Sequence, residues 1–274
     1  MIGQTQLLQE LNIILNRYPK FSIIVGPKGS GKKTIVEYIC KQLNLPMVNF
    51  GTAIEEVRKI IDLSYEQKNP ICYVCADADE MSLGAKNCLL KITEEPPNNA
   101  YFILTLQSMS NTLETISSRG TVFTLDPYSK QDLIQYIKLK GYPFNYSDLI
   151  CNICSTTGEI DELLYNKKDF YLQEFYKFAQ TVAYKIQEPK SGNIFKISKQ
   201  VKTKTNPDGY DPILLFKTVR NLYIEKAIET KKVQYINAAN VTTICLQDLQ
   251  IAVLSTVATI DMWIINVRKV LGGI

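Results

Sequence analysis

The chain has 274 residues, of which 46% are hydrophobic and 21% charged, and its formal net charge is +4. This composition allows packed cores in about two domains, and so small a positive charge does not by itself indicate a nucleic-acid-binding protein. The sequence has no run of 18 apolar residues, and its first residues lack the pattern of a signal peptide. We therefore expect a cytoplasmic protein without a membrane partner.

The first 125 residues predict strands that alternate with helices. The expected strands are short and almost wholly apolar, as strands buried on both faces are. We place them at 21–25, 47–50, 71–75, 101–106 and 122–125, with helices at 4–16, 32–43, 54–65 and 82–93. This alternation is typical of an α/β domain with a parallel sheet.

The pattern changes after Asp126 and Pro127, and no strand is expected beyond them. The apolar spacing predicts helices at 129–140, 146–155, 158–165, 168–186 and 211–230, and one or two more between 246 and 270. We therefore expect a first domain at 1–125, a small helical domain at 126–165 and a larger helical domain at 166–274.

A glycine-rich segment joins the first expected strand to the helix that follows it. It fits the phosphate-loop pattern G-x-x-x-x-G-K and consists of Gly26, Pro27, Lys28, Gly29, Ser30, Gly31 and Lys32. In such a loop the backbone N–H groups and the helix N-terminus hold phosphate oxygens, and the lysine reaches the β- and γ-phosphates. The structural alternative is a glycine turn without a ligand.

Two groups that a hydrolysing phosphate-loop site needs are missing. The hydroxyl that binds Mg²⁺ is replaced by Lys33, and Thr34 comes one residue too late, about 100° further around the helix. After the strand at 71–75, Ala76 and Asp77 stand where two carboxylates are expected. If Ala76 is at the metal position, Asp77 is the base; if Asp77 binds the metal, Ala78 replaces the base. Both readings argue against hydrolysis.

Two CxxC pairs are candidates for a zinc site. Cys72 and Cys75 fall on a strand, where residues three apart point to opposite faces, and Cys151 and Cys154 fall on a helix. The chain has no histidine, and no second pair is close in sequence. We therefore expect the cysteines to be core residues and expect no metal.

Further motifs resemble those of bacterial or phage DNA polymerase III clamp-loader subunits of the delta-prime type, which are AAA+ proteins. The segment NCLLKITEEPP at 87–97 resembles the family signature NALLKTLEEPP, and TISSRG at 115–120 resembles TIxSRC with glycine in place of cysteine. IGQ at 2–4 resembles the family's VGQ start, and IEEVR at 54–58 resembles its IDxIR helix. The resemblance covers roughly residues 1–165.

The resemblance implies a P-loop AAA+ domain at 1–125, a helical lid at 126–165 and an all-α collar at 166–274. It implies a hetero-pentamer with other clamp-loader AAA+ subunits, which loads a sliding clamp on primer-template DNA. It assigns Ala76 to the position of the metal-binding aspartate and Asp77 to the position of the catalytic acid. This chain therefore lacks the carboxylate that would bind the metal. It also puts Asp161 where the family's lid carries a sensor arginine, and an acid there repels a γ-phosphate.

The Ser-Arg motif of the family reaches across to the ATP of a neighbouring subunit. The resemblance thus implies that Arg119 is an arginine finger acting in trans and that Ser118 helps to place it. A guanidinium suits this role because it is planar, charged and able to bind phosphate oxygens bidentately. In this family, delta-prime subunits have lost catalytic groups from their own ATP site but keep the arginine finger. This chain resembles them in both respects. We expect no required cofactor; weak, magnesium-free binding of ATP or ADP at 26–34 stays open.

Contacts with DNA are expected to be made mostly to its phosphates. Lys86 follows the acidic segment, where relatives face DNA, and is a candidate. The lysines between Lys190 and Lys204 are read as a solvated segment rather than a DNA-binding patch.

Three other functions are compatible with parts of the sequence. An active gamma- or tau-like motor subunit would need magnesium binding without the missing groups. A small-molecule P-loop phosphotransferase would leave the helical C-terminal region and the Ser-Arg motif without a role. A nucleotide-gated scaffold outside replication would be recognised by its partners.

Overall fold

The computed structural model describes residues 2–111, 114–142, 147–165, 169–188, 196–204, 206–251 and 255–272. Contacts divide the chain into two compact units. The first consists of 1–144 and 154–162, and the second of 145–153 and 163–274. The region expected as a lid is thus shared between the units.

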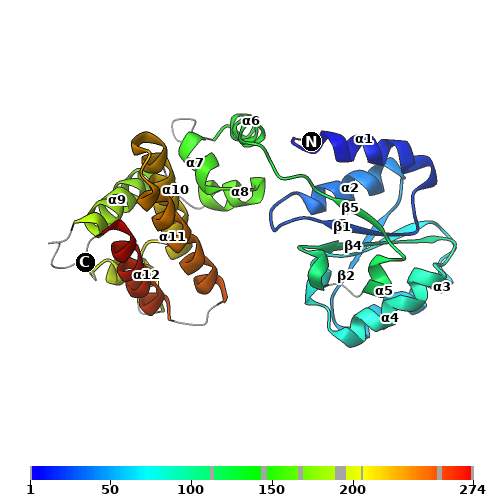
Figure 1. Cartoon of the computed structure of the whole chain (residues 1–274). Helices are drawn as coiled ribbons and strands as arrows, with labels where there is room; N and C mark the ends of the chain where they lie inside the picture. Colours follow the sequence, from blue (N-terminus) through cyan, green and yellow to red (C-terminus); the bar gives the residue numbers. More distant parts are fainter. Residues whose placement is uncertain are drawn as a thin grey trace. The chain divides into compact units, whose positions relative to one another are not determined.

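The first unit contains a parallel sheet of five strands (Figure 1). The strands are β1 (Phe21–Val25), β2 (Met47–Phe50), β3 (Ile71–Cys75), β4 (Ala100–Leu106) and β5 (Thr121–Thr124). Their order is β2-β3-β4-β1-β5, and every pair is parallel. β1 therefore lies between β4 and β5, where the order of the strands reverses. Ligands of open α/β sheets bind at the carboxyl ends of the strands near such a reversal.

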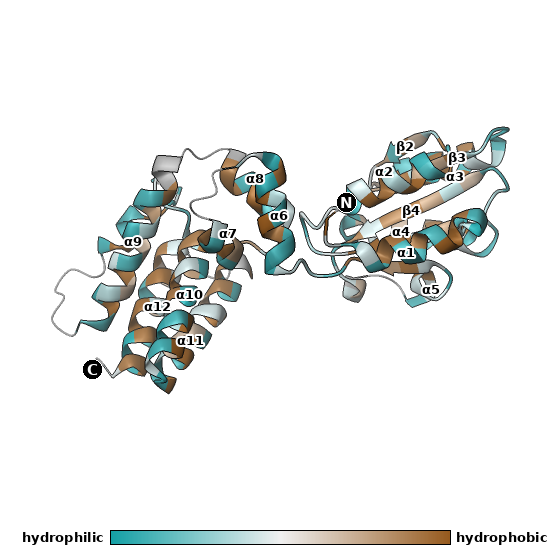
Figure 2. Cartoon of the chain, turned by 90° about the horizontal axis from the view of Figure 1, so that it is seen from above, coloured by the Kyte–Doolittle hydropathy of each residue, from teal (hydrophilic) through white to brown (hydrophobic). Residues whose placement is uncertain are grey.

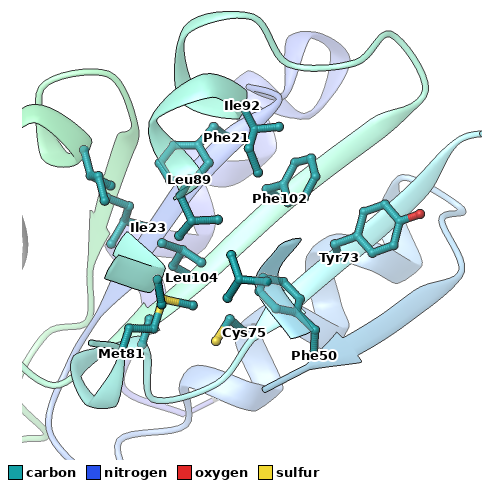
Figure 3. Packing of buried hydrophobic residues seen from close by; sticks show 14 of the residues in the cluster. Phe21, Ile23, Phe50, Tyr73, Cys75, Met81, Leu89, Ile92, Phe102 and Leu104 are labelled. Carbon is teal, nitrogen blue, oxygen red and sulfur yellow. The ribbon is translucent and has the colours of Figure 1, made fainter. Parts of the chain in front are cut away.

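The sheet is apolar on both faces because helices cover both (Figure 1). They are α1 (Thr5–Ile14), α2 (Lys32–Gln42), α3 (Ile54–Glu66), α4 (Leu83–Glu94) and the short α5 (Glu114–Ser117). One core cluster packs under α3, α4 and α5 and the other under α1 and α2. Figure 3 shows the first of these, in which Phe21, Tyr73, Phe102 and Leu89 pack together.

Alternation along β3 separates the two cysteines of the first CxxC pair. Cys75 belongs to the cluster under α3 and α4, and Cys72 to the cluster under α1 and α2. This is the opposite-face geometry expected for a strand. Burial raises the pKa of the Cys75 thiol to about 12, so it behaves as a small core residue.

Helices continue the chain after β5. They are α6 (Lys130–Lys140), α7 (Ser147–Ile153), α8 (Thr157–Tyr165), α9 (Asp169–Gln187), α10 (Pro212–Thr230), α11 (Val233–Ile251) and α12 (Thr256–Leu271). α6 begins with a capping box between Ser129 and Asp132, and α10 begins with Asp211 as N-cap followed by Pro212. α6 and residues 157–162 of α8 belong to the first unit, and α7 belongs to the second.

The second unit is a helical bundle of α9, α10, α11 and α12, with α7 packed on α10. Hydrophobic residues occur along these helices beside hydrophilic ones (Figure 2). Its core contains Trp263, which is fully buried, contacts Phe216 and donates its indole N–H to Thr242 Oγ1 at 2.9 Å. Among the described helices, none combines the length and apolar character needed to cross a bilayer.

Helix α11 extends further than the sequence predicted. We expected the last helices to begin near 246, but α11 begins at Val233. Its first half contains Val, Asn, Ile and Thr residues, which are weak helix formers. The buried positions Ala238 and Thr242 show that packing within the bundle outweighs this local preference.

Candidate functional site

A glycine-rich turn links β1 to α2 at the carboxyl edge of the sheet. Gly26 donates its backbone N–H to Leu106 O over 3.0 Å, so the turn begins in register with β4. Gly29 and Gly31 have φ values of 76° and 92°, a left-handed conformation that is costly for residues with a Cβ. Helix α2 begins at Lys32. The segment predicted as a phosphate loop therefore has the strand–turn–helix arrangement that such loops require.

The side chain of Lys32 folds back over this loop. Its Nζ donates to Gly26 O at 2.7 Å and to Pro27 O at 3.0 Å. Burial lowers the pKa of the Lys32 ammonium below its usual value, and the carboxylates of Asp77 and Asp79 act in the opposite direction. An anion in the loop would offer this ammonium a charged partner in place of two neutral carbonyl oxygens.

The loop opens onto a cavity of about 860 Å³. The N-terminus of α2 beside it has no side-chain cap, so no side chain competes with an anion for its amides. The Oγ of Ser30 is buried and has no hydrogen-bond partner among the described residues. These features fit the phosphate groups of a nucleotide, which the backbone of 26–31 and Lys32 would hold.

The residues at the magnesium positions do not fit that ion. The Lys33 side chain is 84% exposed and lies 3.9 Å from Glu37, and Thr34 is exposed beside it on α2. Ala76 brings no ligand atom on its side chain to the cavity wall. The part of the chain that the structure describes has no cluster of three His, Cys, Asp or Glu side chains suited to a metal.

The two aspartates after β3 have different surroundings. Asp77 has a φ of 51°, donates its backbone N–H to Thr105 Oγ1 at 3.1 Å and lines the cavity. The Asp79 carboxylate accepts the N–H of Gln107 at 2.6 Å and that of Ser108 at 3.4 Å. Asp79 thus ties the end of β3 to the end of β4, while Asp77 remains at the cavity.

The phosphate loop is bonded to the start of α8, a contact that we call the lid latch (Lys28–Gly29 with Thr156–Gly158). Gly29 O accepts the backbone N–H of Gly158 at 2.9 Å and the hydroxyl of Thr157 at 3.2 Å. Thr156 Oγ1 donates to Lys28 O at 3.3 Å. A Cβ on residue 158 would lie 2.4 Å from Gly29 Cα, so the close approach requires glycine. The latch was not predicted from the sequence, because its hydrogen-bonded residues lie 128 or 129 positions apart.

The segment after β5 is also joined to the loop. The side-chain amide of Gln4 donates to Asp126 O at 2.9 Å and accepts from Asp126 N at 3.0 Å. The hydroxyl of Tyr128 donates to Ser30 O at 2.9 Å. A Cβ on Gly3 would lie 2.7 Å from the Tyr128 ring. The IGQ motif thus sets the position of Tyr128 and, with it, one wall of the cavity.

Asp161 lies on α8 at the cavity wall. Its two carboxylate oxygens accept the hydroxyls of Tyr136 at 2.7 Å and Tyr142 at 2.9 Å. Burial and the neighbouring Asp161 carboxylate raise the pKa of Tyr136, so the phenol stays protonated and keeps its bond. Asp161 is therefore held in place and adds negative charge to this side of the cavity.

Arg119 lies just before β5 and away from this cavity. Its Nη2 lies 2.8 Å from Glu94 Oε1, and its Nη1 donates to Thr115 O at 2.7 Å. The hydroxyl of Ser118 donates to Thr115 O as well, at 3.3 Å. The pairing of Arg119 with Glu94, at the end of the NCLLKITEEPP segment, was not predicted from the sequence.

Strand register places Arg119 and the phosphate loop at opposite ends of the strands: Arg119 lies at the amino ends and the loop at the carboxyl ends. Thr121, two residues after Arg119, pairs with Ser22, whereas the loop begins at Gly26. Four residues of extended strand span roughly 13 Å. Arg119 is not among the residues that line the cavity. Its guanidinium is therefore remote from the phosphate loop of its own chain.

The lysines considered for DNA contact lie on the surface or near it. Lys86 is half-buried on α4. Lys190 lies outside the described residues, and the later lysines of that stretch, Lys196, Lys199, Lys202 and Lys204, are exposed. DNA contact by any of them stays a prediction.

Comparison with known proteins gives sequence matches over about half of the chain. Residues 47–129 match the family model described as DNA polymerase III, delta subunit. The gamma subunit of DNA polymerase III from Buchnera aphidicola of Schizaphis graminum is 26% identical over 171 residues, covering 50% of this chain and 47% of that protein. The delta-prime subunit from Haemophilus influenzae is 26% identical over 144 residues, covering 48% and 43%. The chain thus spans about half the length of these relatives.

Solved structures extend the likeness of fold to nearly the whole chain. A DNA polymerase III gamma subunit-related protein from Thermotoga maritima superposes with a TM-score of 0.54 at 16% identity, covering 97% of this chain and 99% of that one. The RuvB Holliday junction branch migration motor of the same organism gives 0.51 at 13% identity, covering 81% and 78%.

The parallel sheet, the phosphate loop after β1 and the helical region that follows have the P-loop fold of AAA+ proteins. Within this class, the sequence matches show that about half of the chain is similar to gamma and delta-prime subunits of DNA polymerase III.

Proposed function

We propose that this chain is a delta-prime-like clamp-loader subunit that does not hydrolyse ATP itself. It assembles with other clamp-loader AAA+ subunits, as a hetero-pentamer in the cytoplasm, and helps to load a sliding clamp on primer-template DNA. The guanidinium of Arg119 contacts ATP that is bound by a neighbouring subunit, and Ser118 helps to position Arg119. The chain's own cavity needs no nucleotide for this role, and ATP or ADP binds there weakly, without magnesium.

One observation carries this proposal: Arg119 and the cavity of its own chain lie at opposite ends of the strands of the sheet. A guanidinium that is remote from its own phosphate loop cannot reach a phosphate held there, so an arginine finger at this position must act on a phosphate group bound by another molecule. The cavity supports the same proposal, because Lys33 and Ala76 stand where magnesium needs a hydroxyl and a carboxylate. The second acid on the cavity wall, Asp161, disfavours a γ-phosphate.

An active motor subunit of the same machine is the alternative. It requires turnover by the purified chain alone that exceeds the turnover of a Lys32→Ala control. The geometry does not support the phosphotransferase alternative, because such an enzyme would have no use for the helical bundle. Transfer of phosphate to a nucleoside monophosphate would revive it.

The test is the ATPase rate of the complex reconstituted with the P-loop ATPase subunits that co-purify with this chain. We expect Arg119→Ala to slow hydrolysis at the one served interface by about 10³-fold, the lower end of the arginine-finger range. The total rate falls only in part because the other interfaces keep their own arginines. Arg119→Lys should fail likewise, since an ammonium lacks the bidentate fork.

Arg17 provides the matched control, since it is an exposed arginine of the same unit. The Arg17→Ala complex should hydrolyse ATP and load the clamp like the wild type. If the Arg119→Ala complex does so too, Arg119 is not an arginine finger.

A further inference from the structure

The backbone around Arg119 is fixed by packing. Ile116 is 1% exposed and inserts into the core cluster under α3 and α4. The N–H groups of Arg119 and Gly120 both donate to Ile116 O, at 3.2 and 3.1 Å. A Cβ on Gly120 would lie 2.8 Å from the ring of Phe21, so this turn fits closely against β1. The Cα of Arg119 therefore has little freedom, and the direction of its guanidinium depends on side-chain contacts.

Two contacts hold the guanidinium on one side. Nη2 meets Glu94 Oε1 at 2.8 Å, and Nη1 donates to Thr115 O at 2.7 Å. Both groups lie at the surface, with 37% of the Arg119 side chain and 55% of the Glu94 side chain exposed. A guanidinium has five N–H donors in a rigid plane, and two contacts leave the others for an acceptor outside the chain.

The position of Glu94 is unusual for an acid. It is the last residue of α4, and the next acid, Glu95, is the C-cap of this helix. The carboxyl end of a helix carries partial negative charge, so an acid there is electrostatically unfavourable. The Arg119 guanidinium offsets this repulsion at Glu94. The pair thus links the end of the NCLLKITEEPP segment to the TISSRG segment, two motifs that the sequence shows separately.

We propose that Glu94 is a positioning residue for Arg119, holding the guanidinium in the orientation in which its unused N–H donors point out of the chain. The proposal rests on the function proposed above, in which those donors meet ATP on a neighbouring subunit. An arginine held in advance needs less reorganisation when charge develops on the transferred phosphoryl group. Glu94 therefore acts on the hydrolysis rate of the neighbour rather than on ATP binding.

The first measurement needs only the free chain. The sequence contains five arginines, so a ¹⁵N spectrum of labelled arginine side chains is simple to assign with an Arg119→Lys variant. In the wild type, the Nη protons of Arg119 should give separate signals, because the two contacts slow rotation about Nε–Cζ. Glu94→Ala should merge them. Glu95→Ala, which removes an equal charge one residue away, should leave them separate.

The second measurement is the ATPase of the reconstituted complex. We expect Glu94→Ala to lower kcat at the served interface by about tenfold, less than Arg119→Ala, with the KM for ATP unchanged. Glu94→Gln keeps an oxygen acceptor at the same place and should recover most of the rate. Glu95→Ala should match the wild type. Melting of the free variants checks that a loss of rate does not come from a loss of fold.

The outcomes separate the two proposals. If Arg119→Ala slows the complex but Glu94→Ala does not, the arginine finger stands and positioning by Glu94 is wrong. The same holds if the Arg119 signals stay separate in Glu94→Ala. If neither variant changes the rate, the proposed function fails, and positioning by Glu94 fails with it. A KM that rises with unchanged kcat would also overturn the positioning role, since Glu94 would then act on binding.

Discussion

The ammonium group of Lys32 gives the cavity a pH dependence that an exposed lysine would not give. Burial lowers its pKa in the folded chain, while the unfolded chain has the ordinary value. Between the two values the unfolded state holds more protons. The contribution of Lys32 to the free energy of unfolding therefore rises with pH in this window. Anion binding changes in the opposite direction, because the protonated form is the one that attracts phosphate.

We therefore expect the affinity for ADP, measured by calorimetry with a chelator present, to fall with rising pH. The fall should begin at a lower pH than the one at which an exposed lysine loses its proton. Lys28 and Lys33 also line the cavity. Lys32→Arg is the control, since a guanidinium keeps its charge throughout this range, and its affinity should stay level. A wild-type affinity as level as that of the arginine variant would contradict the role of Lys32.

At the scale of elements, the lid latch joins α8 to the phosphate loop through one glycine on each side. Gly158 is the second residue of α8, where alanine would normally favour the helix. Because a Cβ there would meet Gly29 Cα at 2.4 Å, we expect Gly158→Ala to lower the free energy of unfolding by about 1–3 kcal/mol in urea titrations.

Gly84 is the matched control, because it is likewise the second residue of a helix, α4. An added Cβ there would meet the flexible Cδ1 end of Ile54 at 3.1 Å and Ser82 Oγ at an ordinary contact distance of 3.8 Å. Gly84→Ala should change the free energy of unfolding by about 0.5 kcal/mol or less. Equal effects of the two substitutions would show that the latch contributes nothing beyond helix preference.

Periodicity in the sequence predicted the strands and most helices, because each of these elements buries a regular set of apolar residues. It failed at the start of α11, where β-branched and Asn residues become helical only through the bundle. At the site, the loop 26–32 could be predicted because its glycines and lysine are contiguous. The contacts of Tyr128 with Ser30 and of Gly158 with Gly29 could not, since they join residues that are distant in sequence.

At the scale of the whole molecule, the two units have separate cores. Leu89 is 1% exposed and belongs to the sheet unit, whereas the single tryptophan, Trp263, is buried in the bundle. Tryptophan fluorescence therefore reports on the second unit alone, and circular dichroism reports on both. α8 is continuous from one unit to the other, so the degree to which their unfolding is coupled can be measured with these two signals.

We expect the units to unfold independently, because each has its own hydrophobic core. Leu89→Ala should then cost the first unit about 2–5 kcal/mol. With a urea m-value of about 1–3 kcal/mol/M, the circular dichroism midpoint of that unit falls by about 1–2 M, while the fluorescence midpoint stays in place. Phe216→Leu, beside Trp263, should do the reverse. If Leu89→Ala shifts both signals together, the chain unfolds as one cooperative body, and the boundary within α8 has no energetic meaning.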